Sequence, residues 1–139
     1  MIQRIQSIYL LVAAIALAVL FALPFATCTP TADGPLADGD LDIQDNVGLL
    51  GLVIAIAALN IVTIFLFNNR KLQMTLTKTS IILILVLLAG VAYFIFTAAA
   101  TLGVGLGIFT PVIGIVVLFL ANRAIDKDEK LVKSSDRIR

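Results

Sequence analysis

The sequence has 139 residues, of which 60% are hydrophobic and 14% are charged, and its mean hydropathy is +1.09. Soluble domains carry about 25% charged residues, and small domains leave much of their surface in water, so this composition excludes an ordinary soluble fold. The formal net charge of +1 gives no electrostatic basis for binding nucleic acid, and the lone cysteine, Cys28, cannot form a disulfide within the chain. We therefore expect the chain to lie in a lipid bilayer.

The first apolar run covers residues 8–26 and contains no charged side chain. About 20 helical residues cross the hydrocarbon of a bilayer, so the run predicts a membrane span. A cleaved signal sequence is the alternative, because Arg4 precedes the run and a lipoprotein-like processing site would end at Cys28. The run is longer than the roughly 7 to 15 apolar residues of a signal sequence, which favours the span.

The segment over residues 27–46 is polar, contains prolines and glycines, and carries acidic but no basic side chains. Its five aspartates are Asp33, Asp38, Asp40, Asp42 and Asp45. The three at alternate positions would suit a calcium ion, but an EF-hand loop needs Gly at its sixth position and Glu at its twelfth, where this chain has Ile43 and Leu49. The pattern predicts a solvated acidic loop that caps the next helix through Asp45 or Asn46, with a weak cation site as the alternative.

The second predicted span covers residues 47–67, and Asn60 is its one strongly polar side chain. Polar side chains in hydrocarbon tend to face neighbouring helices, so Asn60 is interpreted as an interhelical polar clamp. Contact with a substrate is the alternative role. Residues 68–78 follow as a predicted basic loop with no acidic residue.

The third predicted span covers residues 79–102, with Thr79 or Ser80 as its N-cap. Glycines at alternate positions follow it, but no Lys and Ser/Thr come directly after them, so a phosphate-binding loop is excluded. They predict a tight hairpin or a loosened helix start. The fourth span is predicted over residues 105–122, with Pro111 bending its first turns.

All ten basic residues fall into three segments: Arg4, the basic loop and the C-terminal tail. With four spans, these segments share one side, and the acidic loop and the glycine-rich hairpin share the other. The positive-inside rule places both termini in the cytoplasm. In a bacterial inner membrane the acidic loop would face the periplasm.

The tail, residues 123–139, is predicted to continue the fourth span as an amphipathic cytoplasmic helix. Asp126 with Lys130 and Glu129 with Lys133 are spaced for i, i+4 ion pairs. Acidic and basic residues alternate too closely for a polybasic lipid switch. A solvated helix is one interpretation and a partner-docking helix the other. The candidate docking residues are Ile125, Leu131, Val132 and Ile138.

Three stretches of the sequence resemble a known family: M-I-Q-R-I-Q-S-I-Y-L-L, N-R-K-L-Q and L-A-N-R-A-I-D-K-D-E-K-L-V-K-S-S-D-R-I-R. The chain is similar over its whole length to a small Gram-negative bacterial membrane family catalogued as domain of unknown function 4293. The resemblance implies a four-span inner-membrane protein, and it supplies no activity, catalytic residue or binding residue.

These patterns predict an all-α integral membrane protein: four transmembrane helices in one antiparallel bundle, with the fourth extended into the cytoplasm. The leading functional hypothesis is a non-enzymatic scaffold or accessory subunit that docks a protein partner or a second copy. A small transporter or a bundle that binds a neutral or lipid-like molecule is the alternative. An ion-coupled transporter is disfavoured, since the predicted spans contain no Asp, Glu, Lys, Arg or His side chain for a relay. An enzyme is the least favoured class, and no cofactor, metal or nucleic acid is expected, since there is no histidine and no catalytic motif.

Overall fold

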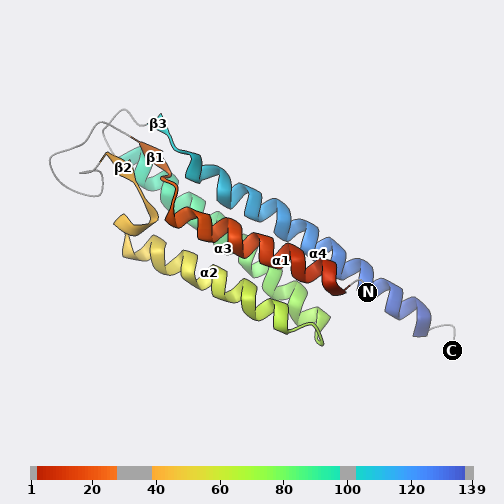
Figure 1. Cartoon of the computed structure of the whole chain (residues 1–139). Helices are drawn as coiled ribbons and strands as arrows, with labels where there is room; N and C mark the ends of the chain where they lie inside the picture. The colour runs from red at the N-terminus through yellow and green to blue at the C-terminus, as the bar shows by residue number, and fades with distance from the viewer. Residues whose placement is uncertain (1–2, 28–38, 98–102, 137–139) are drawn as a thin grey trace.

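The computed structural model describes residues 3–27, 39–97 and 103–136, and its helices form an antiparallel bundle (Figure 1). The helices are α1 (Gln3–Ala18), α2 (Val47–Phe65), α3 (Arg70–Thr97) and α4 (Phe109–Asp136). Each helix packs against its neighbour in sequence, and α1 also packs against α4, which closes the ring. The prediction of a mostly helical chain with four helices is confirmed.

Three helical segments in the described part of the chain are long and apolar enough to cross a membrane: α2, α3 and Leu106–Val132. The first helix is shorter. α1 continues as one 3-10 turn, η1 (Val19–Phe21), and its apolar part is Ile5–Phe21. The helix therefore ends before the predicted span end at residue 26, because Pro24 disfavours helical backbone at the residue before it.

The turn between α2 and α3 is tighter than predicted, because α3 begins at Arg70 rather than at Thr79. Most of the predicted basic loop over residues 68–78 is helix, so the loop prediction was wrong there. Asn69 caps the helix, since its side-chain Oδ1 accepts a hydrogen bond from the backbone N–H of Leu72 at 3.2 Å. Thr79, the predicted cap, lies inside α3 and donates its hydroxyl to the carbonyl four residues earlier.

A small sheet, which the sequence did not predict, lies at the end of the bundle opposite the α2–α3 turn (Figure 1). Its three strands are β2 (Asp40–Leu41), β1 (Ala26–Thr27) and β3 (Gly103–Val104), in that order. Both pairings are antiparallel, and Ala26 pairs with Leu41 on one side and with Val104 on the other. The sheet joins the α1–α2 connection to the α3–α4 connection. The predicted all-α fold class was therefore incomplete, because the fold also contains this small sheet.

The glycine-rich segment before α4 allows two stretches of backbone to pack closely. A Cβ atom on Gly105 would lie 2.3 Å from the carbonyl oxygen of Pro24, and one on Gly107 would lie 2.6 Å from the same atom. The backbone N–H of Gly105 donates to the carbonyl of Phe25 at 2.9 Å, and that of Gly107 to the carbonyl of Pro24 at 2.8 Å. These glycines therefore serve packing at the sheet end of the bundle.

The start of α4 also differs from the prediction. A 3-10 turn, η3 (Leu106–Ile108), precedes the α-helix, which begins at Phe109. The helical segment begins at Leu106, next to the predicted start at Gly105, but it opens with this 3-10 turn rather than with α-helix. Pro111 lies in the first turn, where a backbone N–H has no intrahelical acceptor and its loss costs little.

Part of the predicted acidic loop lies outside the described residues, including Asp33 and Asp38. The rest forms β2 and a 3-10 turn, η2 (Ile43–Asp45). Asn46 caps α2 as predicted, since its Oδ1 accepts hydrogen bonds from the backbone N–H groups of Gly48 at 2.8 Å and Leu49 at 3.2 Å. No group of three or more His, Cys, Asp or Glu side chains within residues 3–27, 39–97 and 103–136 could hold a metal ion.

The outer surface of the bundle is apolar along most of its length. Inside their most apolar windows, only 28% of residues in α2, 22% in α3 and 33% in the last helical segment are buried. Large aliphatic and aromatic side chains such as Ile15, Ile82 and Phe119 are exposed. Soluble monomers rarely expose apolar patches larger than a few hundred Å². Such a surface matches the hydrocarbon of a bilayer rather than water.

Candidate functional site

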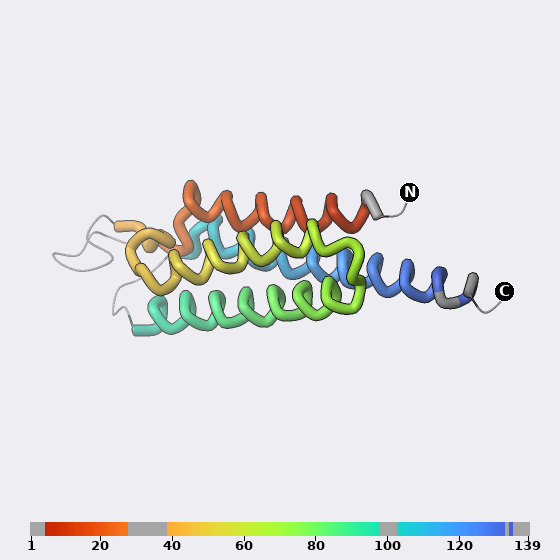
Figure 2. The backbone as a smooth tube through the Cα atoms, turned by 90° about the horizontal axis from the view of Figure 1, so that it is seen from below, coloured from red at the N-terminus to blue at the C-terminus, as the bar shows by residue number. Residues whose placement is uncertain are grey.

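Both chain termini and the α2–α3 turn lie at one end of the bundle (Figure 1), and two hollows lined by polar or charged side chains lie at this end. At this end α4 runs on past the other helices (Figure 2). The residues of α4 beyond the buried Asp128 form its projecting part. The predicted ion pair of Lys130 Nζ with Asp126 Oδ2, which are 2.7 Å apart, lies where this part begins. Both side chains are exposed to solvent, so the pair stabilises the helix by a few tenths of a kcal/mol. The side chain of Lys133, predicted to pair with Glu129, lies outside the described part.

The candidate docking residues on α4 divide into two groups. Leu131 is 49% exposed and Val132 is 44% exposed, so both are available to a partner. Ile125 is 0% exposed and belongs to the buried core, so its assignment to the docking surface was wrong. The helix buries it because this turn of α4 still lies beside α1. Ile138 falls outside the described residues.

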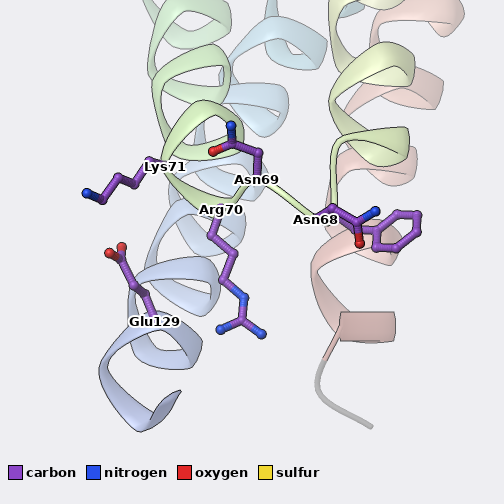
Figure 3. Close-up of a pocket in the computed structure, with 6 residues that line it drawn as sticks. Asn68, Asn69, Arg70, Lys71 and Glu129 are labelled. Carbon is purple, nitrogen blue, oxygen red and sulfur yellow. The ribbon is translucent and has the colours of Figure 1, made fainter. Parts of the chain in front are cut away.

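A polar hollow of about 350 Å³ lies beside the α2–α3 turn. Figure 3 shows its lining side chains around the turn, with Glu129 reaching the same place from α4. The lining residues are Phe67, Asn68, Asn69, Arg70, Lys71 and Glu129. The hollow adjoins the projecting part of α4 and offers amide, cationic and carboxylate groups to a polar partner.

A second hollow, of about 430 Å³, lies between α1 and α4 near the same end of the bundle. It is lined by Ile5, Tyr9, Leu120, Arg123, Ala124 and Lys127, and we refer to it as the α1–α4 groove. Its lining joins apolar side chains to two exposed cations. Sequence reasoning missed this groove, although the i, i+4 spacing of Arg123 and Lys127 was a readable signal that they share a helix face.

The interior of the bundle is polar in the half nearer the α2–α3 turn. Six neutral polar residues there are almost or fully buried: Gln6, Asn60, Thr63, Gln73, Thr77 and Ser80. Gln73 Nε2 donates to the carbonyl of Thr63 at 3.2 Å, which links α3 to α2. The other half of the interior is filled by aliphatic and aromatic side chains.

Several buried polar atoms in this half have no hydrogen-bond partner within the described ranges. They are Asn60 Oδ1 and Nδ2, Gln73 Oε1, Ser80 Oγ and Asn122 Oδ1. Asn60 is 0% exposed, as an interhelical clamp requires, but its amide makes none of the hydrogen bonds that a clamp needs among these residues. An unpaired buried polar group costs about 1 to 3 kcal/mol, so these atoms offer bonding capacity to a small polar molecule.

A buried hydrogen bond joins the two ends of the chain. Gln6 Nε2 in the first turns of α1 donates to Asp128 Oδ2 on α4 at 2.5 Å. Gln6 is 3% exposed and Asp128 is 5% exposed. Asp128 is thus an acidic side chain held inside the bundle, and its hydrogen bond ties α4 to the start of α1.

One family model matches the chain, over residues 2–138, and it is described as a domain of unknown function (DUF4293). The chain belongs to this family. Neither a comparison with curated proteins nor one with solved structures gave a match. The description of DUF4293 assigns no activity, so the function has to be argued from the geometry.

Proposed function

We propose that this DUF4293 protein is a multi-pass protein of a bacterial inner membrane. The apolar outer surface of the bundle supports this, since three helical segments are long and apolar enough to cross a bilayer. α2 alone, with 19 residues, is about 28 Å long, close to the thickness of the hydrocarbon layer. The shorter α1 lies between α2 and α4 and would be carried into the bilayer with them.

Both termini are proposed to face the cytoplasm. The α2–α3 turn, with Arg70 and Lys71, lies at the same end of the bundle as both chain termini (Figure 1). The sheet end carries Asp40, Asp42 and Asp45, and no basic residue is found there in the described segments. Basic residues concentrate on the cytoplasmic side of membrane proteins, which supports this orientation.

The proposed activity is that of a non-enzymatic scaffold or accessory subunit, which docks a protein partner through the projecting part of α4. The observation that carries the proposal is the exposure of Leu131 and Val132 on a helix that has left the bundle. When a partner covers aliphatic side chains on an otherwise charged, projecting helix, their removal from water favours binding. The polar hollow beside the α2–α3 turn would supply hydrogen bonds at the rim of that contact.

Replacing Leu131 and Val132 together by Asp is expected to reduce recovery of a co-purified partner, or of a second tagged copy, by about tenfold or more. Two carboxylates in an apolar contact would have to lose their water without gaining partners. The measurement is quantitative mass spectrometry after purification in mild detergent, alongside the amount of the chain in the membrane fraction.

The control for this experiment changes the charge by the same amount elsewhere. Thr75→Asp with Lys78→Gln alters two exposed positions on α3 and should leave recovery unchanged. Unchanged recovery with Leu131→Asp plus Val132→Asp, or equal losses in both double variants, would contradict docking by this part of α4.

The alternative function, a bundle that binds a small neutral molecule, is favoured by one observation. The buried side chains of Asn60 and Ser80 carry unpartnered polar atoms in a part of the interior lined by uncharged groups. Amide and hydroxyl groups bind neutral polar molecules through hydrogen bonds without the cost of burying a charge. The ligand class would therefore be a small molecule with hydroxyl, amide or carbonyl groups.

The Asn60→Leu variant distinguishes a ligand-binding role of Asn60 from its role as an interhelical polar clamp. Because the amide has no partner in the described structure, its replacement is expected to raise the free energy of unfolding by about 1 kcal/mol. If the Asn60 amide were hydrogen-bonded across helices, its replacement would instead lower the free energy of unfolding by about 1 to 2 kcal/mol. The measurement is SDS titration of the purified protein in detergent, with the exposed Asn68→Leu as a control. A destabilised Asn60→Leu variant would restore the clamp interpretation.

A further inference from the structure

The α1–α4 groove combines two kinds of lining at one place. Ile5 and Leu120 give it an apolar lining, while Arg123 and Lys127 lie one helical turn apart on α4. Both cations are exposed, and neither forms a salt bridge within the described segments. The phenol of Tyr9, which is partly buried, adds a hydrogen-bonding group to the lining.

Two acidic residues in this part of α4 have partners outside the groove. Asp126 pairs with Lys130, and Asp128 is buried against Gln6 on α1. Neither acid lines the groove, and among the side chains that the structure describes its charged lining consists of the two cations. Acids and bases alternate along the sequence, but the i, i+4 spacing of Arg123 and Lys127 brings both cations to the groove. The groove is therefore cationic even though the tail as a whole is nearly balanced.

The groove lies at the border between the apolar and charged parts of α4. Leu120 lies next to the end of the apolar run at Ala121, and Arg123 is the first charged residue of the helix. On α1 the groove reaches Ile5, at the start of the apolar helix Ile5–Phe21. In the proposed membrane placement, this border is the cytoplasmic interface, where lipid phosphates meet acyl chains.

We propose that the α1–α4 groove binds one anionic phospholipid of the cytoplasmic leaflet. Arg123 and Lys127 hold the phosphate, and the first methylenes of an acyl chain lie against Ile5 and Leu120. Arg123 can give the phosphate two parallel hydrogen bonds, and Lys127 adds a second positive charge. Charge complementarity selects the anionic headgroup, and the apolar lining selects a lipid over a soluble anion. The proposal rests on the membrane placement given above.

The test is native mass spectrometry of the full chain, released from nanodiscs that contain equal amounts of phosphatidylglycerol and phosphatidylcholine. The wild-type protein is expected to retain one phosphatidylglycerol in preference to phosphatidylcholine. Arg123→Gln with Lys127→Gln should lower that preference on the order of 20-fold, since each basic residue near an anionic surface contributes about fivefold. Ala124→Leu, which fills the groove without changing the charge, should also reduce retention.

The control is Lys71→Gln with Lys78→Gln, which removes two exposed cations from α3 and should keep the wild-type preference. An equal loss in this control, or an undiminished preference in the Arg123/Lys127 double variant, would overturn the groove as the site. Displacement of the lipid by millimolar glycerol 3-phosphate would overturn the lipid proposal and would show that the groove binds a soluble phosphate. Extraction of the chain from membranes by alkaline carbonate would refute the membrane placement itself, whereas a retained chain with no lipid preference would refute only the groove.

Discussion

Gly105→Ala is expected to lower the free energy of unfolding by about 3 kcal/mol. The new Cβ would lie 2.3 Å from the carbonyl oxygen of Pro24 and 2.8 Å from the carbonyl carbon of Phe25, which are backbone atoms and cannot move aside as a flexible side chain can. Overpacking costs about 1 to 3 kcal/mol, and separating the strands weakens the bond from the Gly105 N–H to the Phe25 carbonyl by about 1 kcal/mol more. SDS or thermal unfolding in detergent measures the loss.

Gly51→Ala is the matched control, because a Cβ there meets no atom within 4 Å. Gly51 lies inside α2, where Ala has the higher helix propensity, so this variant should gain up to about 1 kcal/mol. The same Gly→Ala change should therefore lower the free energy of unfolding at position 105 and raise it at position 51. Similar effects at both positions would mean that the Gly105 backbone does not pack against Pro24 as the structure has it.

The helices were predictable from the sequence because long apolar runs have only one way to satisfy their backbone in hydrocarbon. The sheet was not. Its strands have two residues each, and Ala26 pairs with Val104 from a distant part of the sequence, so no local pattern marks the pairing. Only the alternate glycines hinted at close backbone contact there. The helix start at Arg70 was missed because its basic, polar residues were taken as a loop, although they are good helix formers once Asn69 caps them.

The candidate site was predictable only in part, since which residues on a helix face inward depends on packing. Ile125, Leu131 and Val132 are all apolar residues on the tail, yet Ile125 is buried and the other two are exposed. Gln73 and Thr77 stand i, i+4 on α3, a spacing that signals one polar face. The sequence did not show that this polar face points inward. The residues that follow in α3 are apolar on every side of the helix, so they do not indicate which side faces the bundle.

Gln6→Leu is expected to lower the free energy of unfolding by about 2 to 3 kcal/mol. Its side-chain amide donates to Asp128 Oδ2, and both residues are almost fully buried. A leucine of similar size keeps the packing volume but leaves the Asp128 oxygen without this donor in a place that water hardly reaches. The variant should also loosen the junction where α4 leaves the bundle, and so weaken docking through Leu131, which lies less than one turn beyond Asp128.

A double-mutant cycle separates the hydrogen bond from simple packing. Gln6→Leu with Asp128→Leu removes both polar partners, and replacing a buried polar pair by apolar groups is close to neutral. The double variant should therefore recover most of the stability that the single Gln6→Leu change loses. The coupling energy of the cycle, about 2 kcal/mol, measures the dependence of each side chain on the other. Losses that simply add would show that Gln6 and Asp128 contribute independently, and the junction of α1 with α4 would then depend on the apolar contacts around Ile125 instead.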